Sequence, residues 1–147
     1  IERPQWTDEE KAFAEALNEQ SPQYEAIKAA GELEDGPLST CVAPVSYENG
    51  YGSTDVGDVQ HIVPCVQVMS ATYNLAAPGH SWQITACAGM SIGMKGMLFG
   101  SKVMAAAAMK LVDDPKLMEE VKEGWKKQMK GRTYKCPIPK EIPIPQP

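Results

Sequence analysis

Residues 50–83 contain the stretch on which the rest of the interpretation depends, GYGSTDVGDVQHIVPCVQVMSATYNLAAPGHSWQ. It holds both histidines of the chain, His61 and His80, and it begins with a glycine-rich run that carries two aspartates. Between Asp58 and Lys95 the sequence has no formally charged residue. Because charged side chains are seldom buried, an uncharged run of this length predicts a buried region. Carboxylates and an imidazole beside glycines in such a region indicate a functional site.

The composition is that of one globular domain. The chain has 147 residues, 43% hydrophobic and 22% charged, and is long enough to bury a core. A net charge of -5 argues against a nucleic-acid surface, which needs a basic excess. The four cysteines show no C-x-x-C spacing, which argues against a zinc site and favours a reducing compartment, the cytoplasm.

The ends of the chain and the uncharged run give two further expectations. Pro64, Asn74 and Pro78 interrupt the uncharged run, and a membrane-spanning helix would not carry them together. The chain begins at Ile1 without a methionine, so we expect it to be part of a longer protein.

Four regions predict helices. Residues 7–10 form a capping box, TDEE, that begins a helix ending near Gln20. Ser21-Pro22 begins a second helix that ends at Gly31. A long helix is predicted from Gly89 to about Val112, and a last one from Asp114-Pro115 to Gly131. The long helix contains four glycines, each of which costs roughly 1 kcal/mol relative to alanine. We therefore expect its backbone to pack closely against a sheet or another helix.

Three apolar runs predict strands, and together with the helices they give a fold class. The runs are residues 38–45, 62–69 and 82–88. The resulting order of elements predicts an α/β protein, and it suits one half of an α/β sandwich better than a complete fold. We assign residues 1–136 to this domain and residues 137–147, PIPKEIPIPQP, to an extended proline-rich tail.

His80 is the candidate metal ligand. It follows Pro78-Gly79, so a tight turn would hold its imidazole rigidly and direct one nitrogen outward. The alternative is a hydrogen-bonded structural histidine, because nothing else in the chain completes a coordination sphere of three or four ligands. His61 fits the structural interpretation better.

The glycine-rich loop supplies the candidate binding residues. Asp55 and Asp58 could ligate a metal, act as acid and base, or orient a histidine. They could equally cap the amides of their own loop. Ser53 and Thr54, with neighbouring amides, could bind a substrate carboxylate.

A serine hydrolase is a further alternative. Residues 89–93 read GMSIG, a G-x-S-x-G sequence that would place Ser91 as nucleophile. In that class the histidine follows the serine, and no histidine occurs after His80. Ser91 therefore lacks a base within this chain.

Four segments together resemble one family. They are residues 52–59 (GSTDVGDV), 63–64 (VP), 78–83 (PGHSWQ) and 95–97 (KGM). They resemble the C-terminal part of the metal-dependent amidohydrolases that include aminoacylases, glutamate-releasing carboxypeptidases and auxin-conjugate hydrolases. The branch that acts on p-aminobenzoyl-glutamate is the most similar. The resemblance extends from about Trp6 to the tail that begins at Cys136.

The resemblance implies a fold and a metal centre. The family's catalytic domain is an α/β sandwich interrupted by a lid and dimerisation domain, and this chain matches the part after the lid. Two divalent ions, zinc or manganese, are implied, with His80 as a ligand of one of them. The matching loop residues Ser53, Thr54, Asp55 and Asp58 would lie beside the substrate. The general-base glutamate would lie outside this chain, so no catalytic residue is assigned within it.

The same resemblance implies an activity and partners. The complete enzyme would hydrolyse an N-acyl or aryl amide of an amino acid with metal-activated water. The implied partners are the N-terminal half of the same domain, the lid domain, the small substrate, and a second subunit in a homodimer or heteromer. We expect no nucleic-acid or membrane partner, and we expect this chain alone to be inactive. The alternative is a non-catalytic module that binds a partner through glycine-rich helix faces.

Overall fold

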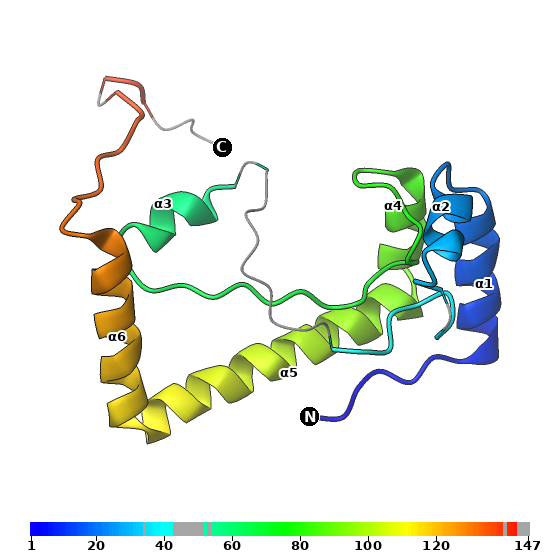
Figure 1. Ribbon diagram of the computed structural model, residues 1–147, viewed down its shortest axis with the longest axis horizontal. Coiled ribbons are helices and arrows are strands. Elements are labelled where there is room, and N and C mark those ends of the chain that lie inside the picture. Colours follow the sequence, from blue (N-terminus) through cyan, green and yellow to red (C-terminus); the bar gives the residue numbers. More distant parts are fainter. Residues whose placement is uncertain (34, 43–51, 53, 140, 144–147) are drawn as a thin grey trace. The chain divides into compact units, whose positions relative to one another are not determined.

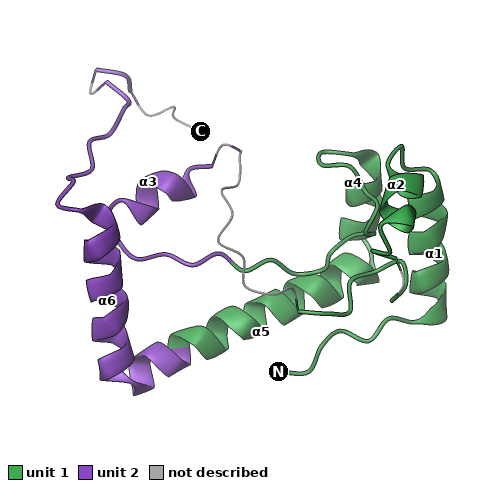
Figure 2. Cartoon of the chain, in the orientation of Figure 1, with its two compact units in different colours: residues 1–46, 68–108 green, residues 47–67, 109–147 purple. Residues whose placement is uncertain are grey.

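The computed structural model describes residues 1–33, 35–42, 52, 54–139 and 141–143. This described part contains six α-helices and no strand (Figure 1). The chain divides into two compact units (Figure 2). Unit 1 comprises residues 1–46 and 68–108, and unit 2 comprises residues 47–67 and 109–147.

Unit 1 contains α1 (Asp8–Glu19), α2 (Tyr24–Ala29), α4 (Trp82–Ala88) and most of α5 (Ser91–Asp113). Figure 1 shows α1, α2 and α4 beside one another near the beginning of α5. The capping box predicted for α1 is confirmed: the Thr7 hydroxyl accepts from the Glu10 amide, and the Glu10 carboxylate accepts from the Thr7 amide. These reciprocal bonds satisfy two amides at the start of α1.

The core of unit 1 draws on segments that are far apart in the sequence. Its buried side chains come from the N-terminal arm, α1, the segment after α2, α4 and α5. They are Trp6, Ala14, Leu17, Leu38, Cys87 and Ile92. Burying side chains of this kind contributes on the order of 1.5–3 kcal/mol for each large one. Hydrophobic packing therefore holds α1, α4 and the start of α5 together.

The glycines of α5 let the chain approach the helix backbone. A Cβ on Gly96 would overlap with the carbonyl oxygen of Ala71, and one on Gly100 would lie 3.1 Å from the Ser70 hydroxyl. The close packing predicted from these glycines is therefore present. Its partner is the irregular segment 70–72, neither a sheet nor a helix.

Unit 2 contains α3 (Val56–Gln60), α6 (Pro115–Met129) and the last residues of α5. The Asp114 side chain accepts from the Leu117 amide at 3.0 Å, as predicted for the cap of the last helix. The Trp125 indole donates to the Gln60 carbonyl at 2.7 Å and links α6 to the end of α3. The described part of the proline-rich tail, residues 137–139 and 141–143, contains no helix or strand.

The predicted strands, and with them the α/β sandwich, are wrong for the described residues. Residues 82–88 form α4, in which Gln83 and Cys87 are buried four positions apart, a helical rather than an alternating period. Residues 64–69 and 38–42 have no regular structure, and residues 43–45 lie outside the described part. A strand needs a neighbour for its backbone hydrogen bonds, and the described chain supplies none here.

The prediction that the uncharged run is buried is also wrong. Val66 is 80% exposed, Met69 is 87% exposed and Trp82 is 57% exposed. The absence of charge permits burial but does not produce it, because burial also needs neighbouring segments.

Candidate functional site

His80 stands on a tight turn between the irregular segment 68–77 and helix α4. Its backbone lies in the left-handed region, with φ of 57°. A non-glycine residue pays roughly 1–2 kcal/mol for this conformation, and such strain concentrates at functional sites. The imidazole is exposed. The turn predicted at His80 is thus present, but a helix follows it where a strand was predicted.

A buried amide anchors the chain just before this turn. Asn18 of α1 is fully buried, and its side-chain oxygen accepts from the Asn74 side chain at 2.7 Å and from the Ala76 amide at 2.9 Å. Its side-chain nitrogen donates to the Pro37 carbonyl at 3.3 Å. Buried polar groups that are fully paired rigidify a structure. Asn18 therefore ties the segment that leads to His80 to the core of unit 1.

An open hollow of about 700 Å³ surrounds the turn. It is lined by Tyr73, Gly79, His80, Ser81, Trp82, Ile84 and Thr85. Two buried polar atoms next to the turn, Ser81 Oγ and Gln83 Oε1, have no hydrogen-bond partner in the described part of the chain. Because nearly all buried polar atoms are paired, these two mark unused hydrogen-bonding capacity beside His80.

In the predicted binding loop neither aspartate is seen to cap the amides of its own loop among the described hydrogen bonds. Thr54, rather than an aspartate, makes the local turn, since its hydroxyl accepts from the Val56 amide at 3.3 Å. Asp55 occupies the N-cap position of α3 without a side-chain cap bond. Thr54, Asp55 and Asp58 are all exposed. Ser53 lies outside the described residues.

Asp58 and His61 belong to a small cluster with Tyr134. Burial, together with hydrogen bonds to Cys136 and Asp58, raises the pKa of Tyr134 to about 12. The His61 ring lies 6.2 Å from the Tyr134 ring, and His61 Nδ1 is 2.7 Å from the Gly57 carbonyl, to which it donates. These contacts give His61 the structural role expected for it.

The predicted site residues fall into separate units. His80 lies in unit 1, and Thr54, Asp55 and Asp58 lie in unit 2. Within the described residues, no group of three or more His, Cys, Asp or Glu side chains could hold a metal ion.

Ser91 has a structural partner. Its hydroxyl donates to Glu10 Oε1 at 2.5 Å, while the Lys95 ammonium lies 2.7 Å from Glu10 Oε2. Burial would raise the pKa of Glu10, but hydrogen bonds from Lys95, Ser91 and Thr7 lower it to about 2. So weak a base does not activate a hydroxyl near neutral pH. The arrangement joins α1 to α5 and does not support Ser91 as a nucleophile.

Sequence reasoning missed a second cavity in unit 1, named here the Arg3 pocket. It has a volume of about 650 Å³. Its fifteen lining residues come from the N-terminal arm, segments 39–42 and 68–75, and α5. A local sequence motif cannot predict this cavity, because its lining comes from four segments that are far apart in the sequence. The one available signal was an arginine in an acid-rich N-terminal region.

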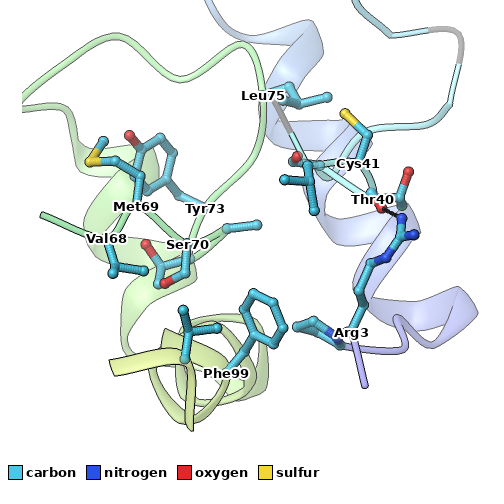
Figure 3. Close-up of a pocket in the computed structure, with 15 residues that line it drawn as sticks. Arg3, Thr40, Cys41, Val68, Met69, Ser70, Tyr73, Leu75 and Phe99 are labelled. Carbon is cyan, nitrogen blue, oxygen red and sulfur yellow. Dashed lines mark hydrogen bonds between the residues drawn. The ribbon is translucent and has the colours of Figure 1, made fainter. Parts of the chain in front are cut away.

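The Arg3 pocket combines one cation with apolar walls. Figure 3 shows Arg3 on the side opposite Met69 and Tyr73, with Phe99 of α5 below the space between them. The Arg3 guanidinium donates to the Thr40 carbonyl at 2.7 Å. Among the fifteen lining residues, Arg3 alone carries a charge.

No helix in the described ranges is both long and apolar enough to cross a membrane.

Comparison with known proteins finds a related sequence at high significance. The chain is 33% identical over 157 aligned positions to a subunit of the p-aminobenzoyl-glutamate hydrolase of Escherichia coli (strain K12). The alignment covers 95% of this chain and 32% of that protein, so the chain spans about a third of its relative's length. No protein-family model matches the chain, and no solved structure matches it significantly.

Proposed function

We propose that this chain is part of a hydrolase that cleaves an N-acyl or aryl amide of an amino acid, such as p-aminobenzoyl-glutamate. The observation that carries the proposal is the similarity to the E. coli hydrolase subunit along 95% of this chain. Because the alignment covers 32% of that subunit, we assign the remaining parts of the active site to residues outside this chain.

In this proposal His80 is one metal ligand. An exposed imidazole on an anchored turn suits ligation, because the turn fixes its direction. A divalent ion, zinc or manganese, when bound supplies an activated water and polarises the amide carbonyl. One histidine falls short of the three or four protein ligands that zinc needs, and the described residues offer no group of three or more His, Cys, Asp or Glu side chains that could hold a metal ion. The other ligands and the general-base glutamate must then come from elsewhere, and the isolated chain should neither retain a metal ion tightly nor hydrolyse amides.

The loop residues Ser53, Thr54, Asp55 and Asp58 are proposed to contact the substrate. The exposure of the last three supports this role, as does the absence of a cap bond from the Asp55 carboxylate. Asp58 also contributes to the raised pKa of Tyr134, so its replacement should lower that pKa.

The relative is named as a subunit, and we propose that this protein likewise acts with a partner subunit. One observation counts against the non-catalytic alternative: Gly93 and Gly96 of α5 already pack against the backbone of Ala88 and Ala71.

The test is amide hydrolysis by the protein expressed from its complete reading frame, together with any partner subunit. Release of p-aminobenzoate and bound metal are measured for the wild type and for His80→Ala. We expect the variant to lose most activity and one equivalent of metal while keeping its circular dichroism spectrum. His61→Ala is the matched control and should retain both. Unchanged turnover in His80→Ala would remove His80 from the site, and no turnover in the wild type would contradict the proposed activity.

A further inference from the structure

The Arg3 pocket has the size of a small-molecule site, and one of its walls is closely packed. Its volume of about 650 Å³ lies within the range of roughly 300–1,000 Å³ that is typical of ligand pockets. One wall is fixed because Gly96 and Gly100 let segment 70–72 lie directly on α5, where Phe99 and Val103 face the cavity. On the opposite side the exposed Arg3 guanidinium donates to the Thr40 carbonyl. The wall that lies on α5 is therefore formed before a ligand arrives.

The walls favour a flat apolar ligand body. Phe99 and Tyr73 present aromatic rings, and Val68, Leu75 and Val103 add aliphatic surface. Aromatic side chains favour stacked or edge-to-face contact with another ring.

The charge of the pocket favours an anion. Arg3 is the one charged residue among those lining the cavity, and arginine remains protonated at all physiological pH values. The single described hydrogen bond of the guanidinium goes to the Thr40 carbonyl, which leaves its other N–H groups for a ligand. A guanidinium binds a carboxylate through two parallel hydrogen bonds, a stronger arrangement than a neutral contact.

We propose that the Arg3 pocket binds a small aromatic carboxylate, with the ring between Phe99 and Tyr73 and the carboxylate on Arg3. This site is separate from the proposed role of His80, although Tyr73 lines both hollows. The proposal requires neither metal nor amide hydrolysis, so the two can fail independently.

The test uses the full 147-residue chain and the probe 2-naphthoate, with 2-naphthamide as its neutral counterpart. Isothermal titration calorimetry should show that 2-naphthoate binds. The affinity of 2-naphthamide should be lower by about tenfold or more, because the amide lacks the charge-assisted bonds. No detectable naphthoate binding, or equal affinity for the two probes, would overturn the proposal.

Two pairs of variants locate the site. Arg3→Gln should weaken naphthoate binding about tenfold or more. Arg132→Gln makes the same charge change in unit 2 and should leave the affinity for naphthoate unchanged. Val103→Phe should fill the cavity and abolish binding. Val112→Phe, on the same helix but 77% exposed, should not. Equal losses within either pair would mean that the probe binds non-specifically.

The same titration separates this proposal from the function proposed above. His80→Ala should still bind naphthoate with unchanged affinity, even where it abolishes hydrolysis in the complete protein. Loss of naphthoate binding in His80→Ala would contradict a separate site.

Discussion

In unit 1 buried polar groups join segments that are distant in sequence, whereas in unit 2 the side-chain ion pairs are local and exposed. Asn18 and Glu10 of α1 are 0% and 7% exposed, and they bond to Asn74 and Lys95 respectively. In α6 of unit 2 the ion pairs join residues three or four positions apart and are largely solvated, as between Lys126 and Glu123. Water replaces a lost exposed bond but not a lost buried one. Substitutions in unit 1 should therefore be much more harmful than matched substitutions in unit 2.

The largest contrast should come from glycine substitutions. Gly96→Ala places a Cβ onto the Ala71 backbone and should lower the free energy of unfolding by about 2–3 kcal/mol, a typical cost of overpacking. In α6, a Cβ on Gly124 would meet no atom within 4 Å. Gly124→Ala should therefore raise the free energy of unfolding by about 0.5–1 kcal/mol, because alanine has a higher helix propensity than glycine. Urea unfolding followed by circular dichroism measures both. A Gly96→Ala variant as stable as the wild type would show that segment 70–72 can move away from α5.

The second contrast concerns the buried amide. Asn18→Ala leaves the Asn74 side chain and the Ala76 amide without their shared acceptor, and it should cost about 2 kcal/mol. Gln20→Ala, at the exposed end of the same helix, removes a single bond to Ala16 and should change stability by less than about 0.5 kcal/mol. The same unfolding measurement applies. Equal effects for the two variants would contradict the anchoring role of Asn18.

The smallest contrast is acid sensitivity. The pKa of Glu10 falls from its ordinary 4.5 to about 2 in the folded chain, so the unfolded chain binds this proton more tightly. Its stabilising contribution should be complete above about pH 5 and should disappear as the pH falls toward 2. Glu10→Gln should remove this part of the pH dependence and cost about 1–2 kcal/mol at pH 7.

Glu123→Gln is the control for that experiment. Its hydrogen bond with Lys126 lowers the pKa of Glu123 too, but both side chains are more than half exposed. The variant should therefore follow the wild-type stability curve between pH 2 and 7 closely. The urea midpoint of each variant is measured between pH 2 and 7. If the midpoint of Glu10→Gln depends on pH as steeply as that of the wild type, the stabilising role assigned to ionised Glu10 is contradicted.

Several features were predictable because they depend on residues close together in the chain. The caps at Thr7 and Asp114 each involve residues three positions apart. The close approach to α5 was readable from repeated glycines, whose cost in a helix has to be offset by packing. The turn at His80 followed from the Pro-Gly dipeptide that precedes it.

The strands and the buried run were predicted wrongly for a common reason. A seven-residue apolar run such as 82–88 is compatible with a strand or a helix, and the choice depends on what lies against it. Here Cys87 packs into a core that includes residues of α1, so the helical period prevails. Residues 64–69 have the composition of a strand but no neighbour in the described chain with which to form one.

Local spacing in the sequence specified where helices α1 and α6 begin and which turn carries His80. Folding settled the rest, because the decisive contacts join residues that no local pattern connects. Asn18 and Asn74 are 56 residues apart, and Glu10 and Lys95 are 85 apart. The Arg3 pocket likewise forms only where four separate segments come together, and their side chains give it its charge and shape.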